Sequence, residues 1–283
     1  MALAQVLSRA CVGVEAPLIT VEVHLAGGLP CVSIVGLPET AVREARDRVR
    51  SALQNSGFEF PVSRVTISLA PAELPKEGGG FDLPIALGIL AASGQLPAEP
   101  LAGCEFAGEL ALTGNLRPVR GALAMVLTAA REGRAFVLPA DSAREAALAE
   151  RATVYAADSL LEVCAHLSGR SQLVRCAASV QDTQGQYPDL SDVKGQTHVK
   201  RVLEIAAAGA HSLLMVGPPG AGKTMLAERL PSIMPKLDSD AAFAVAALES
   251  VTHQGVDLHD WFRMRFRRPH HNCTVAAMTG GGK

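Results

Sequence analysis

The residues whose types and spacing point most clearly to chemistry form one eight-residue stretch. They are Gly217, Pro218, Pro219, Gly220, Ala221, Gly222, Lys223 and Thr224. They match the pattern G-x-x-x-x-G-K-[ST] at every fixed position. Glycines let a backbone turn tightly, so that its N–H groups can point inward at phosphate oxygens. We therefore expect Lys223 to reach the β- and γ-phosphates of ATP, and the Thr224 hydroxyl to hold the accompanying Mg²⁺.

The segments on either side of this stretch are those that a phosphate loop needs. The apolar run SLLMVG at 212–217 predicts a strand that ends at the first glycine, and KTMLAERLP at 223–231 predicts an amphipathic helix. The N-terminus of that helix would add its dipole to the attraction for phosphate. This context favours a phosphate-binding loop over a chance glycine turn.

The rest of the chain predicts an α/β protein of two domains. Its 283 residues are 48% hydrophobic and only 4% aromatic, which favours α/β layers over a small aromatic core. Strand-like and helix-like segments alternate from residue 12 to residue 169, with one helix predicted over 39–57. We place a first domain at 1–170, a polar linker at 171–189 and a second domain at 190–283.

Composition excludes several classes of protein. The net charge of −2 gives no global reason to bind nucleic acid, and the six cysteines contain no CxxC pair that would indicate a zinc site or a disulfide framework. The chain starts with a poor signal peptide, and no apolar run reaches the roughly 20 residues of a membrane span. We therefore expect a cytoplasmic protein without a membrane partner.

Longer motifs resemble one family, the magnesium-chelatase-like AAA+ ATPases of bacteria known as the YifB/ComM group. The matching segments are VEVHLAGGLPCVSIVGLPETAVREARDRVRSAL, PAELPKEGGGFDLPIALGIL, the stretch from DVKGQTHVK to AERLP, RFRRPHH and the final GGGK. The resemblance implies an N-terminal Lon-protease-like domain of the ribosomal S5 type, followed by a P-loop AAA+ domain. It also implies hexameric rings, and a DNA branch-migration helicase in natural transformation. The segment from Asp192 and Val193 to Gln196 would lie beside the adenine and ribose.

An AAA+ ATPase also needs an apolar strand that ends in Asp-Glu, which holds Mg²⁺ and polarises the attacking water. The acidic segments after Thr224, LDSD at 237–240 and LES at 248–250, do not follow a run of β-branched residues. In the family this strand comes after the segments that match RRPHH and GGG. We therefore expect a chain truncated before this strand, the arginine finger and the lid, with weak nucleotide binding and negligible hydrolysis.

A peptidase is a rival prediction that the Lon-like resemblance raises. The serine and lysine of Lon-type peptidases fall at Gly80 and Leu123, which can neither attack a carbonyl nor take a proton. We therefore expect no peptidase activity. The triglycine at 78–80 is either a tight turn before a helix, with Asp82 as N-cap, or a loop near Lys76 that binds a partner or DNA. The alternative function for the chain is a non-catalytic interaction module with a pseudo-protease domain.

Two basic segments and a histidine pair complete the candidates. Arginines at 43, 46, 48 and 50 favour a solvated helix face over a nucleic-acid patch. The tail WFRMRFRRPHH at 261–271 interleaves arginines with aromatic residues. This composition suits the binding of single-stranded nucleic acid. It suits equally well a hairpin whose arginines contact a neighbouring subunit or water. His270 and His271 would point to opposite faces of a strand, so we expect no metal site there.

Overall fold

The structure is a computed structural model, and it describes residues 2–13, 15–149, 151–177, 187–252, 256 and 262–279. The chain divides into two compact units. The first contains residues up to 181 together with Ala244–Leu258, and the second contains Asp182–Phe243 and His259–Lys283. Trp261 and the glycines at 280–282, which the sequence singled out, lie outside the described residues.

A mixed sheet of seven strands forms the centre of the first unit, in the order β3-β4-β2-β1-β5-β8-β9. The strands are β1 (Ala2–Arg9), β2 (Leu18–Ala26), β3 (Cys31–Val35), β4 (Arg64–Ala70), β5 (Cys104–Phe106), β8 (Ala135–Pro139) and β9 (Val154–Ala157). Four of the six neighbouring pairs are parallel, and only β1–β2 and β2–β4 are antiparallel. A separate hairpin joins β6 (Glu109–Leu110) to β7 (Leu116–Arg117). The predicted mixed α/β fold is confirmed.

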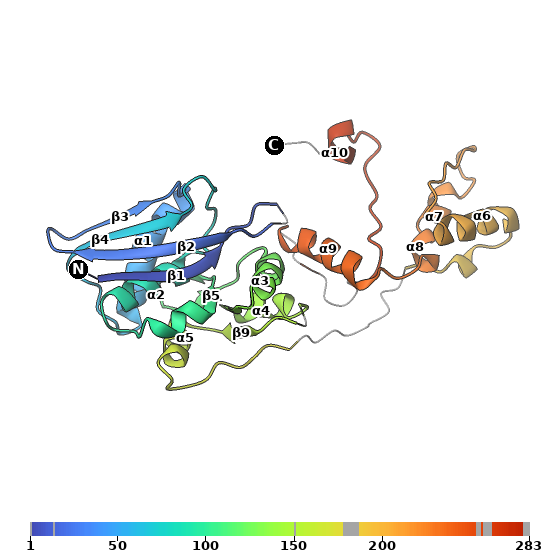
Figure 1. Cartoon of the computed structure of the whole chain (residues 1–283). Helices are drawn as coiled ribbons and strands as arrows, with labels where there is room; N and C mark the ends of the chain where they lie inside the picture. The colour runs from blue at the N-terminus through green and yellow to red at the C-terminus, as the bar shows by residue number, and fades with distance from the viewer. Residues whose placement is uncertain are drawn as a thin grey trace. The chain divides into compact units, whose positions relative to one another are not determined.

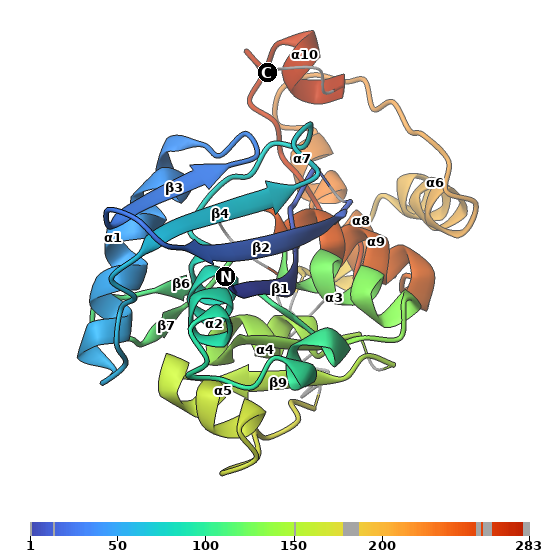
Figure 2. The ribbon, with the colours of Figure 1, turned by 60° about the vertical axis from the view of Figure 1, so that its left-hand side comes forward.

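Helices cover this sheet (Figures 1 and 2), and the apolar side chains between the layers are buried. They are α1 (Thr40–Asn55), α2 (Asp82–Ala92), α3 (Ala122–Arg131), α4 (Ala140–Ala146) and α5 (Leu160–Leu167), with a 3₁₀ turn, η1 (Glu99–Gly103). Helix α2 packs against β1 and β2, and α1 packs against α2. Gly88 permits this close approach, because a Cβ there would lie 2.6 Å from Val23 Cγ2. The core of the first unit therefore lies between the sheet and α1 and α2.

The second unit is smaller, and its described residues form helices and turns but no strand. Its elements are η2 (Leu190–Asp192), α6 (Thr197–Ala208), α7 (Lys223–Ala227), α8 (Leu230–Ile233) and α10 (Val275–Thr279). Helix α9 (Ser239–Ser250) contributes residues to both units. A core cluster of Leu190, Val193, Leu203 and Leu226 joins η2, α6 and α7. This cluster holds the predicted phosphate loop against the segment that precedes α6.

The segment at 212–217 is irregular, so the strand predicted from SLLMVG is wrong for this structure. Leu214 and Val216 are 86% and 87% exposed. A strand needs a neighbour to accept and donate its backbone hydrogen bonds. No other described segment of the second unit is a strand, so this apolar run has nothing to pair with.

Candidate nucleotide-binding site

The predicted phosphate loop leads directly into a helix, as the motif requires. Helix α7 begins at Lys223, and Gly222 precedes it with φ +80°. Gly220 has φ +82°. Residues with a side chain rarely adopt this left-handed backbone conformation, which explains why glycine occupies these two positions. The backbone from Val216 to Ala221 is exposed, so a phosphate can approach it from solvent.

Lys223 lies over the loop that it follows. Its Nζ donates hydrogen bonds to the carbonyl oxygens of Gly217, at 2.7 Å, and Pro218, at 2.8 Å. An ammonium binds a phosphate oxygen more strongly than a neutral carbonyl, so a bound phosphate would compete for these contacts. The Thr224 side chain is exposed in the first turn of α7, where its hydroxyl is free of the core. These residue types fit a nucleotide with its Mg²⁺.

The segment from Asp192 to Gln196 packs directly beside the phosphate loop. Gln196 Nε2 donates to the carbonyl oxygen of Ala221, at 3.3 Å, and Asp192 Oδ2 lies 3.6 Å from Arg229 Nη2. Val193 is only 2% exposed and belongs to the core cluster. Its side chain therefore positions the segment, and any contact with a nucleotide would come from its backbone. The placement of Asp192 and Val193 beside a base and ribose stays a prediction.

The acidic residues after the loop belong to helix α9. Asp238 Oδ1 accepts a hydrogen bond from the Ala241 N–H, at 2.7 Å, which caps the start of that helix. Asp240 and Glu249 lie within α9 itself. Within the described part of the chain after Thr224, no acidic residue lies at the end of a strand. Among the described residues, no acid at the end of a strand therefore accompanies the predicted phosphate loop.

The two peptidase positions lie in a turn and in the core. Gly80 ends the triglycine turn before α2, and Leu123 is fully buried in α3. Neither position carries a group that could act as nucleophile or base. The geometry offers no serine–lysine chemistry at these positions.

Residues beside the triglycine turn are structural, which corrects the N-cap expectation and weighs against the binding-loop alternative. Asp82 is not the N-cap of α2, because Phe81 occupies that position. The Asp82 carboxylate instead accepts two hydrogen bonds from Arg48, at 2.8 and 3.0 Å. Lys76 is fully buried and donates to the carbonyl oxygen of Pro71, so it does not present a charge to DNA. Burial lowers the pKa of the Lys76 ammonium.

The arginines of α1 do not form a shared basic face. Arg48 pairs with the buried Asp82, Arg46 pairs with Asp47, and Arg50 lies over the Phe60 ring at 5.3 Å. These contacts engage three of the four arginines, and of these Arg48 is partly buried while Arg46 and Arg50 are exposed. They favour the structural interpretation over a nucleic-acid patch.

The basic tail is irregular and packs on the second unit. Arg268 Nη1 lies 2.6 Å from Glu228 Oε1, and Arg263 lies 6.0 Å from the centre of the Tyr187 ring. His270 and His271 are not in a strand, and their rings stack with centres 4.2 Å apart, so the expectation of opposite faces is wrong. Within the described ranges, no cluster of three or more His, Cys, Asp or Glu could hold a metal ion.

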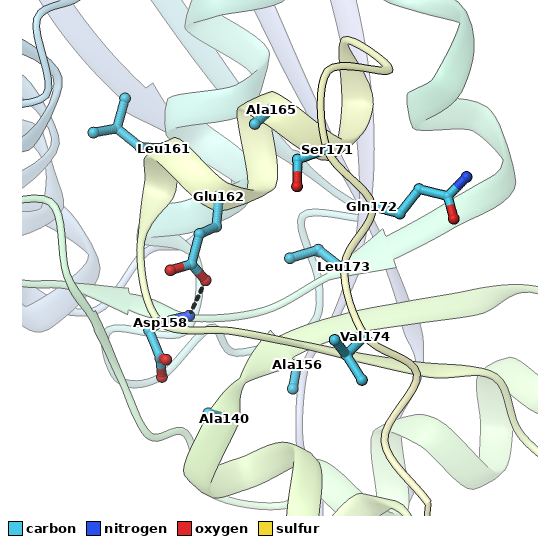
Figure 3. A pocket seen from close by; sticks show the side chains of 10 residues that line it. All are labelled: Ala140, Ala156, Asp158, Leu161, Glu162, Ala165, Ser171, Gln172, Leu173 and Val174. Carbon is cyan, nitrogen blue, oxygen red and sulfur yellow. Dashed lines mark hydrogen bonds between the residues drawn. The ribbon is translucent and has the colours of Figure 1, made fainter.

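A pocket of about 580 Å³ lies in the first unit, between α5, the turn before it and residues 171–174 (Figure 3). Its two carboxylates come from Asp158 and Glu162, and Glu162 Oε2 accepts the Asp158 N–H at 2.9 Å. Apolar walls from Leu161, Leu173 and Val174 complete it. Its lining lies entirely in the first unit, so it is no part of the phosphate loop.

A buried ion network was missed from the sequence. Arg9 and Glu105 are both almost fully buried and make two hydrogen bonds, of 2.6 and 2.8 Å. Arg134 adds a third to Glu105, at 2.7 Å, and Glu132 Oε2 lies 3.0 Å from Arg9 Nη2. Arg9 and Glu105 are 96 positions apart in the sequence, and no local pattern joins them. The network is structural, since the Arg9–Glu105 pair at its centre lies inside the fold, with Glu132 and Arg134 at its partly exposed end.

Comparison with known proteins identifies the family. The family described as subunit ChlI of Mg-chelatase matches residues 21–142, and the family described as magnesium chelatase, subunit ChlI, matches residues 189–283. Competence protein ComM of Haemophilus influenzae is 48% identical over the whole of this chain. Proteins named YifB from Salmonella typhimurium and Escherichia coli are 51% and 49% identical over the whole chain.

The chain belongs to the magnesium-chelatase-like family of ComM and YifB. The resemblance drawn from the motifs is thereby confirmed, and the family supports an AAA+ ATPase type of function. The match covers 56% of each of these relatives, so the chain spans about half of their length. Among the described residues, no helix is long and apolar enough to cross a lipid bilayer.

Proposed function

We propose that this chain binds ATP with Mg²⁺ through residues 217–224, as the nucleotide-gripping part of a magnesium-chelatase-like AAA+ motor. The observation that carries the proposal is the phosphate loop itself. Its glycines hold left-handed backbone at 220 and 222, and Lys223 lies over the loop at the start of α7. Such loops bind phosphates through backbone N–H groups and a lysine.

Each residue of the site has a distinct role. When ATP binds, Lys223 replaces its hydrogen bonds to the loop carbonyls with contacts to the β- and γ-phosphates. The Thr224 hydroxyl is a ligand for Mg²⁺, and Mg²⁺-ATP supplies the transferable γ-phosphoryl group. Asp192 and the Val193 backbone lie beside the adenine and ribose. The Gln196–Ala221 hydrogen bond ties that segment to the phosphate loop.

The described residues favour weak binding and negligible hydrolysis. Phosphoryl transfer depends on positioning and electrostatics, and an acid beside the attacking water is part of both. After Thr224 the described acidic residues cap or form α9 rather than end a strand. Leu214 and Val216 are also exposed, and among the described residues of the second unit no strand supports the loop.

The whole protein would be a cytoplasmic, DNA-remodelling motor that works as a hexameric ring, with a branch-migration helicase activity in natural transformation. The name of the ComM relative, a competence protein, supports a role in natural transformation. Ring assembly follows from the usual organisation of AAA+ motors. DNA is the proposed substrate of the ring, and the exposed Arg267 and Arg268 are candidate contacts.

A second candidate is a non-catalytic interaction module with a pseudo-protease domain. It rests on the Lon-like resemblance of the first unit's sequence, in which Gly80 and Leu123 stand at the positions of the catalytic serine and lysine. The two candidates differ in whether nucleotide binding matters for what the protein does.

Steady-state ATP hydrolysis by this chain tests the proposal about the site. We expect turnover near the background of a Lys223→Ala variant. Turnover of about 1 per second, which lies within the ordinary enzyme range, would show that the described residues contain a complete catalytic site and would refute the proposed division of roles.

A further inference from the structure

The two edges of the seven-stranded sheet differ in whether another described segment pairs with the edge strand. At the β9 edge, Cys176 N–H donates to the Val154 carbonyl oxygen, at 2.8 Å, and Ala156 N–H donates to the Val174 carbonyl oxygen, at 3.3 Å. The chain after α5 therefore covers that edge. At the other edge, β3 pairs with β4 on one side, and no described residue pairs with its outer side (Figure 1).

The open edge lacks the features that usually prevent association. Strand β3 reads Cys-Val-Ser-Ile-Val and contains neither a charged residue nor a proline. Exposed edges of this kind are templates for another strand unless charge, proline or a bulge protects them. The outer edge of β3 is therefore suited to pairing with a further strand.

Apolar side chains are displayed at both ends of this edge. Leu29 is 88% exposed and Leu37 is 62% exposed. Leu37 also has φ +53°, a left-handed backbone that a leucine rarely adopts. Strain of this kind persists only where the surroundings impose it, and it often marks a binding segment. Here it holds an apolar side chain in solvent.

The sequence of the edge is complementary to itself. Antiparallel pairing of two copies centred on Ser33 would place Val32 opposite Ile34 of the second copy, and Cys31 opposite Val35. Pairs of β-branched side chains stabilise adjacent strands, and no charges of like sign would oppose one another. Val32 and Ile34 are only half-buried at present, so the pairing would also complete their burial.

We infer that the outer edge of β3 is a self-association surface, through which two copies of this chain join their sheets antiparallel about Ser33. This contact is two-fold symmetric, so it differs from the head-to-tail contact of a closed ring. It does not depend on nucleotide, and it goes beyond the proposed ATP site.

A cross-link tests the register. Cys31 and Val35 lie on the same face of β3, next to Arg64 and Ser68 of β4. In the proposed pair, Cys31 would directly oppose Val35 of the second copy, and directly opposed residues have Cα atoms about 4.5–5.5 Å apart, within reach of a disulfide. Within one strand the same positions are roughly 13 Å apart, so no bond can form inside one copy.

Mild oxidation of the full-length Val35→Cys variant should give a covalent dimer joined through Cys31 and the new cysteine, identified by mass spectrometry. Adding Cys31→Ser should abolish it. The matched control is Val174→Cys, since Val174 is 78% exposed and lies at the opposite, β9 edge of the sheet. Equal dimer yields from the Val35 and Val174 variants, or a different cysteine pair, would overturn the inference.

The association state gives a second test without cysteine chemistry. Sedimentation should find a dimer of the wild-type chain, weakened at least about fivefold by Ser33→Lys, which would oppose two like charges. Ser68→Lys is the control, because Ser68 lies on the same sheet face in β4. A monomeric wild type, or equal weakening by both lysine variants with folded circular dichroism spectra, would contradict the proposal.

Discussion

The buried carboxylate of Glu105 provides the sharpest test of how the first unit is held together. β1 and β5 share one registered pair, Leu7 with Glu105, where the two halves of the sheet meet. Glu105 accepts two hydrogen bonds from Arg9 and one from Arg134 at this junction. Glu105→Gln keeps the shape of the side chain but removes the charge that compensates these guanidinium groups.

The expected loss follows from burial. The side chains of Arg9 and Glu105 are 1% and 0% exposed, and removing one partner of a buried ion pair costs about 3–5 kcal/mol. Domains are stable by only about 5–15 kcal/mol, so the variant should lose a large share of its stability. The Arg9→Met/Glu105→Leu double variant removes both charges and should recover most of that loss.

Native-state hydrogen exchange of the β1 and β5 amides measures the effect on this unit alone. The Glu105→Gln variant should exchange faster by roughly two to four orders of magnitude. Glu109→Gln is the control, since its partner Arg117 is 61% exposed and the pair should contribute at most about 1 kcal/mol. If Glu105→Gln accelerates exchange no more than Glu109→Gln, the network does not hold the two halves of the sheet together.

Two further predictions concern packing and a buried thiol. Gly88→Ala should lower the melting temperature, because its Cβ would lie 2.6 Å from Val23 and overpacking costs about 1–3 kcal/mol. The control is Gly27→Ala, whose Cβ meets nothing within 4 Å and which should leave the melting temperature unchanged. Equal melting temperatures of the two variants would contradict this. Burial, and then the Glu77 carboxylate, raise the pKa of Cys11 from 9.0 to about 11, so iodoacetamide at pH 8 should modify Cys11 only in urea-unfolded chain. Because the folded-state pKa is the higher one, this thiol stabilises the fold below pH 9, and that contribution is lost as the pH rises towards 11. Equally fast modification of native and unfolded chain at pH 8 would show that the thiol is not protected.

Local periodicity was sufficient to predict most elements of the first unit. One stripe of α1 has residues that are each at most 1% exposed: Val42, Ala45, Val49 and Leu53. Such a pattern needs only neighbours along one helix face, so it can be read without the rest of the fold. The same holds for β2 and β4, whose alternating residues follow the two faces of the sheet.

Strand β1 was missed because its inward side chains are not all apolar. Ser8 and Arg9 are buried there, and the charge of Arg9 is compensated by residues about 100 positions later. Asp82 was misassigned for the same reason, since its partner Arg48 comes from another helix. Such pairings are tertiary, and no local sequence pattern contains them.

The phosphate loop was predictable as a motif, but its strand was not predictable from local sequence. The apolar run at 212–217 has the composition of a buried strand, and in this structure no described strand of its unit lies beside it. Hydrogen-bond partners decide whether such a run becomes a strand. The assignment of Asp192 and Val193 to nucleotide binding stays a prediction, although both lie beside the loop.

Titration of a fluorescent ATP analogue with Mg²⁺ into the full-length chain tests the central claim most directly. Lys223→Ala should weaken binding at least about tenfold, whereas Lys200→Ala in α6 should leave it unchanged. The proposed site predicts saturable binding by the wild type and loss in the Lys223 variant alone. Equal affinity of the wild type and the Lys223→Ala variant would contradict it, because the loop would then not be what holds the nucleotide.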